Sequence, residues 1–395
     1  MTVRKVGGYG RTPMESKRSR PLVSAAIIVR DEADFLRTCL TSISPLCDEI
    51  VVVDTGSSDD SVEVARSFGA VLGYRQWDGD FSAARNTALD LATGEWILYI
   101  DADEQIENLD AEAARSEIEA ATNAVALRVR FKSRPHFTAY REYRMWRHRP
   151  DIRFRNQIHE TMVPDLNRIE AEEGLSILDI DSVEICHYGY EGDQTRKHLR
   201  NLPLLEIQVV DTPQRCYLWD QLGLTRDALG DPVGAGEAWE TGVGLIRELG
   251  LVDRTDIAVY VNYALHLVAW GRDATGLIDE GLAMAPWCAA LDWAAALNHR
   301  AFERYDESIP HLRRLIDTSP DDIDPAVGYQ VSMLTDWALA ELADSLFHVG
   351  DLRGSATMYR RAADTVPDDR SLLVKAVAVE SYANSKADLH QVGEG

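Results

Sequence analysis

The sequence is poor in cysteine, in basic residues and in long apolar runs, and each shortage argues against a class of protein. Its five cysteines are scattered through 395 residues without a Cys-x-x-Cys pair, which predicts reduced thiols in a cytoplasmic protein rather than disulfides or a zinc site. The 41 lysines and arginines face 65 aspartates and glutamates, so a net charge of -24 predicts no nucleic-acid partner. The apolar runs are too short for a membrane span.

The composition favours a globular protein of two domains. Hydrophobic residues make up 45% of the chain, enough for a sizeable core. The pattern changes near Thr195, where strand signals give way to helical ones. We expect a flexible basic tail at 1–20, which lacks the apolar core of a secretory signal, and an α/β domain at 21–195. An all-α domain at 196–388 and a frayed end at 389–395 would follow.

An apolar strand that ends in carboxylates is the centre of the first domain. Residues 96–100 are apolar and rich in β-formers, as is typical of a buried parallel strand. Asp101 and Asp103 follow at its carboxyl end, where open α/β sheets bind their ligands. Carboxylate oxygens suit Mg²⁺ or Mn²⁺, and a metal held in this way can neutralise a diphosphate.

Strands and helices alternate before this point. Further strands are predicted at 24–29, 49–53 and 70–74, with helical patterns between them. Such alternation predicts a mainly parallel sheet. The first strand is followed by Arg30-Asp31-Glu32 and not by Gly-x-Gly-x-x-Gly, so a nucleotide would be bound in some other way than in a dinucleotide-binding fold.

Four motifs occur in order along this domain: Ala26–Glu32, Val53–Ser57, Phe81–Asn86 and Asp101–Glu104. Together they resemble family 2 glycosyltransferases, which have the GT-A fold. The resemblance implies a nucleotide-sugar donor, with a UDP-sugar favoured, a divalent metal (Mn²⁺ or Mg²⁺) and inversion at the anomeric carbon. The first motif departs from the family, because Arg-Asp stands where Lys-Asn is commoner.

The resemblance also implies roles for the donor side of the site. Asp31 or Glu32, together with Asp54, would accept hydrogen bonds from uracil and ribose. Turn capping is the alternative for Asp54. Arg85 would approach the diphosphate or form a structural salt bridge. Asp101 would lie near the ribose.

Asp103 is the favoured metal ligand in this interpretation, and Asp101 is a further candidate. His187 is expected at the end of a strand, and a carboxy-terminal histidine often completes the metal site of GT-A enzymes. A histidine with a purely structural role is the alternative. Arg141, Arg144 and Arg147 are expected on a strand, where they would clamp a diphosphate or shape the acceptor site; a solvated face is preferred for Arg147.

A second polar motif, Asn156-Gln157-Ile158-His159-Glu160, supplies candidates for the general base. It lacks the second histidine of a zinc protease. An inverting transfer needs a group that takes the acceptor proton. Glu160 is the first candidate and His159 the second, while a buried structural His-Glu pair is the alternative.

The second domain carries degenerate tetratricopeptide-like repeats. Trp219, Leu222 and Gly223 match the start of such a repeat, and Pro286 and Pro320 are 34 residues apart, which is its period. Stacked repeats form a curved solenoid with a concave face. That face could bind a partner or acceptor, with little part in donor chemistry; packing on the first domain or a homodimer is the alternative.

The sequence thus predicts a metal-dependent inverting glycosyltransferase with a GT-A domain and a helical repeat domain. This domain order is similar to that of peptide S- and O-glycosyltransferases of glycosylated bacteriocin pathways, so the expected acceptor is a Cys, Ser or Thr side chain of a peptide. A saccharide or small metabolite is the alternative acceptor. A non-catalytic interaction scaffold is the alternative from another class.

Overall fold

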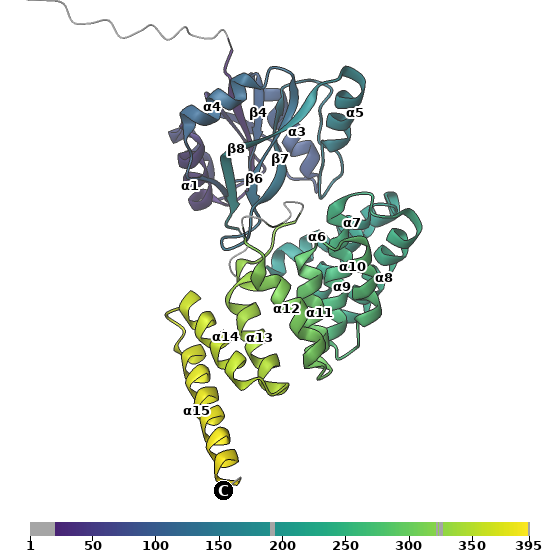
Figure 1. Ribbon diagram of the computed structural model, residues 1–395. Coiled ribbons are helices and arrows are strands. Elements are labelled where there is room, and N and C mark those ends of the chain that lie inside the picture. The colour runs from purple at the N-terminus through teal and green to yellow at the C-terminus, as the bar shows by residue number, and fades with distance from the viewer. Residues whose placement is uncertain (1–19, 190–193, 321–322, 324–326, 394–395) are drawn as a thin grey trace, which may run out of the picture.

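The computed structural model describes residues 20–189, 194–320, 323 and 327–393. The expected tail, apart from Arg20, lies outside this part of the chain. Figure 1 shows an α/β domain and, next to it, a stack of helices that runs to the C-terminal helix. Among the helices of the described ranges, none is both long and apolar enough to cross a bilayer.

An eight-stranded sheet forms the first domain. Its order is β3-β2-β1-β4-β7-β6-β8-β5. The pairing is parallel from β3 to β4, antiparallel on both sides of β7, parallel between β6 and β8, and antiparallel between β8 and β5. The strands are β1 (Val23–Val29), β2 (Glu49–Asp54), β3 (Val71–Tyr74), β4 (Trp96–Tyr99), β5 (Glu104–Glu107), β6 (Ala124–Lys132), β7 (Tyr140–Arg147) and β8 (Ser176–His187).

Helices cover both faces of this sheet, because its central strands are apolar on both sides. Alternate residues of β1 show this: Ala25 and Ile27 pack with one layer of helices, and Ala26 packs with the other. The first layer contains α1 (Ala33–Ile43), α2 (Ser61–Ser67) and α4 (Ala111–Ala120). The second layer contains α3 (Phe81–Leu91) and α5 (Val163–Glu173).

The second domain consists of consecutive helices that pack as antiparallel pairs, as the repeat pattern predicts. Pro286, Pro320 and Pro367 come just after α10, α12 and α14, where the repeat motif places its proline. The helices are α6 (Thr195–Asp211), α7 (Cys216–Ala228), α8 (Pro232–Leu249), α9 (Ala258–Ala269), α10 (Thr275–Met284), α11 (Ala289–Ala301), α12 (Tyr305–Asp317), α13 (Asp336–His348), α14 (Leu352–Thr365) and α15 (Arg370–Gly393).

Close packing explains the repeat motif at the start of this domain. Gly223 on α7 lies against the ring of Trp239 on α8, and a Cβ atom at Gly223 would be 2.5 Å from that ring. Trp239 is buried in the helical core. At the other end of the domain, α15 continues through Gly393, so helix extends into the segment expected to fray; residues 394–395 lie outside the described ranges.

Candidate active site

The carboxyl ends of β1, β2 and β4 meet at one edge of the sheet, and predicted donor residues lie there. Asp31 follows β1 with a left-handed backbone (φ 54°), and its carboxylate accepts hydrogen bonds from the backbone N (2.6 Å) and the hydroxyl (2.9 Å) of Ser58. These bonds lower the pKa of Asp31. Asp54 ends β2 and accepts from the N–H of Gly56 at 3.1 Å and from that of Ser57. Both carboxylates therefore brace the loop after β2, and the turn-capping role considered for Asp54 is present.

Glu32, which follows Asp31, interacts electrostatically with the carboxylates after β4. Burial, followed by the negative charges of Asp103 and Asp101, raises the pKa of Glu32 to about 7. The negative charges of Glu32, Asp101 and Asp103 therefore act on one another, and the contact of Glu32 with uracil or ribose stays a prediction. A cation or a proton at this place would relieve the repulsion among the three acids.

Arg85 joins the two sides of the site. Arg85 lies in α3. Asp80 caps the start of this helix, because its side chain accepts a hydrogen bond from Ala83 N at 2.9 Å. The Arg85 guanidinium is buried. Its Nη1 lies 2.7 Å from Asp101 Oδ1, and its Nε donates a hydrogen bond to Glu160. Burial by itself would raise the pKa of Asp101, but the positive charge of Arg85 holds this pKa at about 2. The structural salt bridge considered for Arg85 is thus present and connects Asp101 with Glu160.

Arg144 supports this arrangement from β7. Its two terminal nitrogens each lie 2.9 Å from a carboxylate oxygen of Glu104, and both side chains are buried. Glu104 also accepts a hydrogen bond from Asp101 N at 2.9 Å. Arg144 therefore fixes the turn that carries Asp101, and Glu104 occupies the guanidinium that the sequence offered to a diphosphate or to the acceptor site.

The neighbouring arginines of β7 are also held by the protein. Arg141 donates to the carbonyl of Ile180 at 2.8 Å. Arg147 donates to the carbonyl of Ala121 at 2.9 Å, and its guanidinium carbon lies 4.1 Å from the centre of the Trp96 ring. The solvated face expected for Arg147 is therefore corrected to a packed, hydrogen-bonded position, because its guanidinium covers an aromatic ring.

Asp103 and His187 are brought together by the pairing of β5 with β8, whose register places Glu104 opposite His187. His187 Nε2 lies 3.3 Å from Asp103 Oδ2. Burial raises the pKa of Asp103 to about 6, with a further contribution from Asp101, and burial lowers the pKa of His187. Gly189 leaves room for the pair, since a Cβ atom there would be 1.8 Å from Asp103 Oδ2.

Asp103 and His187 could hold a divalent metal only if a substrate supplied further ligands. Within the described ranges, no group of three His, Cys, Asp or Glu side chains is placed to hold a metal ion. Magnesium sites commonly use one or two carboxylates and complete their shell with phosphates and water. Asp103 and His187 fit such a partial shell. Gly189 N–H donates to His187 Nδ1 at 3.1 Å, so Nε2 carries the proton toward Asp103, and a metal bound there would displace it.

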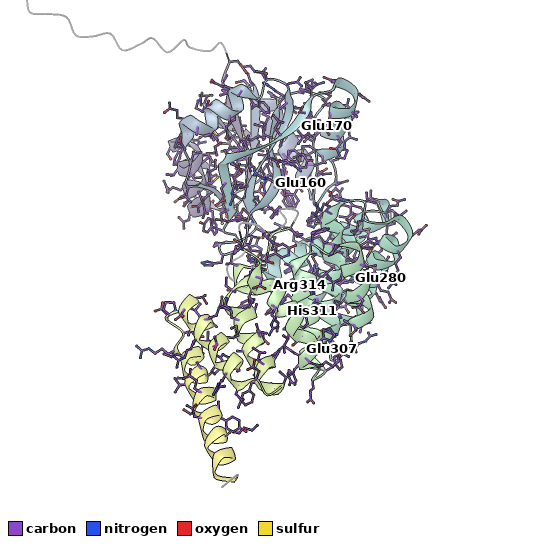
Figure 2. All side chains as sticks on the ribbon, viewed as in Figure 1. Glu160, Glu170, Glu280, Glu307, His311 and Arg314 are labelled. Atoms are coloured by element: carbon purple, nitrogen blue, oxygen red, sulfur yellow. The ribbon has the colours of Figure 1, made fainter. Side chains whose placement is uncertain are left out.

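Glu160 and His159 end a loop on the side of the domain that faces the helices; Figure 2 labels Glu160. The N-terminus of α3 holds this loop: Phe81 N donates to the Gln157 carbonyl at 2.9 Å. Glu160 pairs with Arg85, whereas His159 Nδ1 lies 3.3 Å from the hydroxyl of Tyr217 on α7. The two candidates therefore have separate partners. Burial, aided by the charges of Arg215 and Lys197, lowers the pKa of His159 to about 4, so its ring is neutral at pH 7.

Two basic residues of α6 approach the site and were missed by the sequence reasoning. Lys197 interacts electrostatically with Asp103, and Arg200 with Glu32. The Arg200 guanidinium carbon lies 5.2 Å from the centre of the Phe81 ring. Both residues fall after position 195, where the catalytic domain was expected to end. The basic run from Arg196 to Arg200 directly after that position was the available signal.

Comparisons with known proteins agree with this architecture. Residues 24–169 match the family described as glycosyl transferase family 2. A TPR repeat-containing protein of Synechococcus elongatus is 37% identical over 206 residues, 51% of each chain. The SPbeta prophage-derived glycosyltransferase SunS of Bacillus subtilis is 29% identical over 213 residues, 51% of this chain and 47% of that protein. The chain thus matches about half the length of these relatives. The match to family 2 glycosyl transferases therefore lies in the α/β domain, and consecutive helices with a tetratricopeptide-like pattern follow it.

Proposed function

We propose that the protein is a metal-dependent inverting glycosyltransferase that moves a sugar from a nucleoside-diphosphate donor, a UDP-sugar, to a Cys, Ser or Thr side chain of a peptide. The observation that carries this proposal is the bridge through Arg85. It links Asp101, at the strand edge where a donor would bind, with Glu160, on the loop that faces the helices. Sugar transfer needs a donor site and an acceptor base within reach of each other.

In this proposal the donor side uses residues at the sheet edge. Asp31 and Asp54 would hold the loop after β2 against the base and ribose. Asp103 and His187 would bind Mn²⁺ or Mg²⁺, which when bound neutralises the charge of the leaving diphosphate. Lys197, from α6, would add positive charge next to Asp103.

On the acceptor side, Glu160 would take the proton from the attacking atom. The acceptor would form its bond to the anomeric carbon on the face opposite the diphosphate, so the configuration inverts. Arg85 engages Oε1 of Glu160, so Oε2 would be the proton acceptor. His159 is the alternative base, and its neutral ring can accept a proton at pH 7.

A peptide acceptor is supported by the helical repeats that adjoin Glu160 and by the similarity in domain order to peptide glycosyltransferases. Helical repeats offer an extended groove for a long chain. A saccharide or small metabolite would not need that groove. Peptides that differ only in carrying Cys, Ser, Thr or Ala would identify the acceptor atom.

The test measures nucleoside diphosphate released from a panel of sugar donors, with Mn²⁺, with Mg²⁺ and with a chelator. We expect release to need a divalent metal and to rise with a suitable peptide. Asp103→Ala should abolish turnover and keep the fold, because a diphosphate without its metal is a poor leaving group. Asp90→Ala is the control, since Asp90 forms a surface ion pair with Arg153 at 2.6 Å. Asp103→Ala turnover within about threefold of the parent would overturn the metal assignment.

A further inference from the structure

Two turns of the catalytic domain have a left-handed backbone and give their carbonyl groups to the helical domain. His159 has a φ of 49° and His136 a φ of 68°. The His159 carbonyl accepts a hydrogen bond from Arg215 Nη1 at 3.1 Å, and the His136 carbonyl accepts one from Val331 N at 2.9 Å. Left-handed residues other than glycine are held only where the surroundings fix them.

The first turn belongs to the loop that carries Glu160. Ile158 is 4% exposed and packs in a cluster with side chains from α6, α7 and α8. Next to it, the ring of His159 meets the ring of Tyr217 edge-on at 5.3 Å, and the Tyr217 hydroxyl lies 3.3 Å from Nδ1. The partners of Ile158 in the cluster are Leu205, Val209, Leu218, Leu222 and Ala238.

The second turn joins β6 to β7, the strand that carries Arg144. It pairs with the segment that precedes α13: Thr138 N donates to the Tyr329 carbonyl at 2.7 Å, and Tyr329 N donates to Thr138 Oγ1 at 2.9 Å. Tyr329 is 2% exposed and its hydroxyl lies 3.8 Å from Cys288 Sγ at the start of α11. The helical domain therefore contacts the catalytic domain at two turns, those of His159 and His136.

We infer that the helical domain sets the geometry of the active site, and that Arg215 and Tyr217 are positioning residues that hold Glu160 in place through His159. This inference rests on the proposed function, because it gives Glu160 a part in the reaction. Glu160 follows His159 directly, so a change in the backbone of His159 would turn Glu160 away from Arg85. Because the donor residues Asp31 and Asp54 are held by the loop after β2, donor binding should be spared.

The inference adds a role in positioning the base to the expected acceptor binding by the repeats, and it agrees with the expectation that they have little part in donor chemistry. Deletion of the repeats would remove Arg215 and Tyr217 and uncover Ile158, an apolar side chain buried by the helices. Point variants in the full-length chain are therefore the better experiment.

The variants are Arg215→Ala, Arg215→Lys and Tyr217→Phe. Arg247→Ala and Tyr305→Phe are matched controls, since Arg247 forms an exposed pair with Glu280 on α8 and α10, and Tyr305 stacks on His348 in a later repeat. The measurements are kcat and KM for sugar transfer, and binding of UDP with Mn²⁺. Hydrogen–deuterium exchange is followed in the segment 155–161, in the full-length protein without substrate.

We expect Arg215→Ala to lower kcat by about 10- to 100-fold, because small displacements of catalytic groups have effects of this size. The affinity for UDP should stay within threefold of the parent value, and exchange in the segment 155–161 should become faster while the melting temperature changes no more than in the controls. Arg215→Lys should restore part of the kcat, since an ammonium can still reach a carbonyl, and Tyr217→Phe should show a smaller loss.

Unchanged exchange in the segment 155–161, together with a kcat within twofold of the parent, would overturn the inference. A parent enzyme that releases no nucleoside diphosphate from any donor would instead contradict the proposed function. In that case the exchange measurement still decides whether Arg215 and Tyr217 hold the loop.

Discussion

Arg85 donates a hydrogen bond from Nε to the carboxylate of Glu160, a residue 75 positions later in the chain. The same guanidinium bonds to Asp101, so one buried cation compensates two carboxylates, Glu160 at 9% side-chain exposure and the partly exposed Asp101 at 27%. Burial of an ion pair is favourable only when its charges and hydrogen bonds are satisfied. This pair therefore ties the sheet edge to the loop that the helices hold, and the following predictions depend on it.

Arg85→Ala should destabilise the protein by about 3–5 kcal/mol, because the largely buried Glu160 and the partly buried Asp101 lose their shared counterion. The free energy of unfolding from denaturant titration measures this loss. Arg66→Ala is the control, since Arg66 pairs with Glu63 at the surface and should cost less than about 1 kcal/mol. Adding Glu160→Gln to Arg85→Ala should recover part of the stability. No recovery, or an Arg85→Ala loss equal to that of the control, would contradict the bridge.

Glu160→Gln should lower kcat by about 10²–10⁴-fold while donor binding changes little, because it removes the proposed base and keeps a neutral side chain of the same shape. A thiol acceptor should soften the loss, since thiols ionise more readily than hydroxyls. The measurement is kcat with matched Cys and Ser peptides. A normal kcat in this variant, together with a strong defect in His159→Gln, would assign the base to His159.

Gly189→Ala should weaken Mn²⁺ binding about 10-fold or more, because the added methyl group would occupy the position of the Asp103 carboxylate and turn it from His187. Titration of Mn²⁺ in the presence of UDP measures this affinity. Gly276→Ala is the control, since its Cβ atom would meet open space in α10. Equal Mn²⁺ affinities in the two variants would remove Asp103 and His187 as a metal pair.

Stability should depend on pH through His159. Its pKa is about 4 in the folded chain, against an ordinary value of 6.5, so between these values the unfolded chain binds a proton that the folded chain does not. The stabilising contribution is present above pH 6.5 and is lost as the pH falls toward 4, by up to about 3 kcal/mol. Denaturant midpoints at pH 7, 5.5 and 4.5 should therefore fall more steeply for the parent than for His159→Gln. Parallel curves would show that His159 does not titrate in this way.

Gly223→Ala should destabilise the helical domain by about 1–3 kcal/mol, because the methyl group would overlap the buried Trp239 ring. Gly244→Ala, in α8, provides the opposite case: its Cβ atom would meet open space, and alanine should stabilise the helix by about 0.5–1 kcal/mol. Thermal unfolding of the two variants checks the contrast. A stabilising Gly223→Ala would mean that α7 and α8 are not packed this closely.

The sequence by itself determined the local elements and the edge at which the candidate residues lie. Short apolar runs rich in β-formers predicted β1, β2 and β4, and a carboxylate directly after a buried strand must lie at the strand's carboxyl end. A strand that ends at His187 was predicted as well, and the repeats after Thr195 were predicted from the motif at Trp219, Leu222 and Gly223 and from the 34-residue spacing of Pro286 and Pro320.

Only the tertiary structure decided which charged groups face each other. Arg144 could have met a diphosphate, but the position of β7 beside β4 brings it to Glu104 instead. Likewise, Ile158 finds its apolar partners on helices that begin after the catalytic domain. Ion pairs and loop packing join residues far apart in the chain, and a local pattern contains no information about which distant element will bury a given side chain.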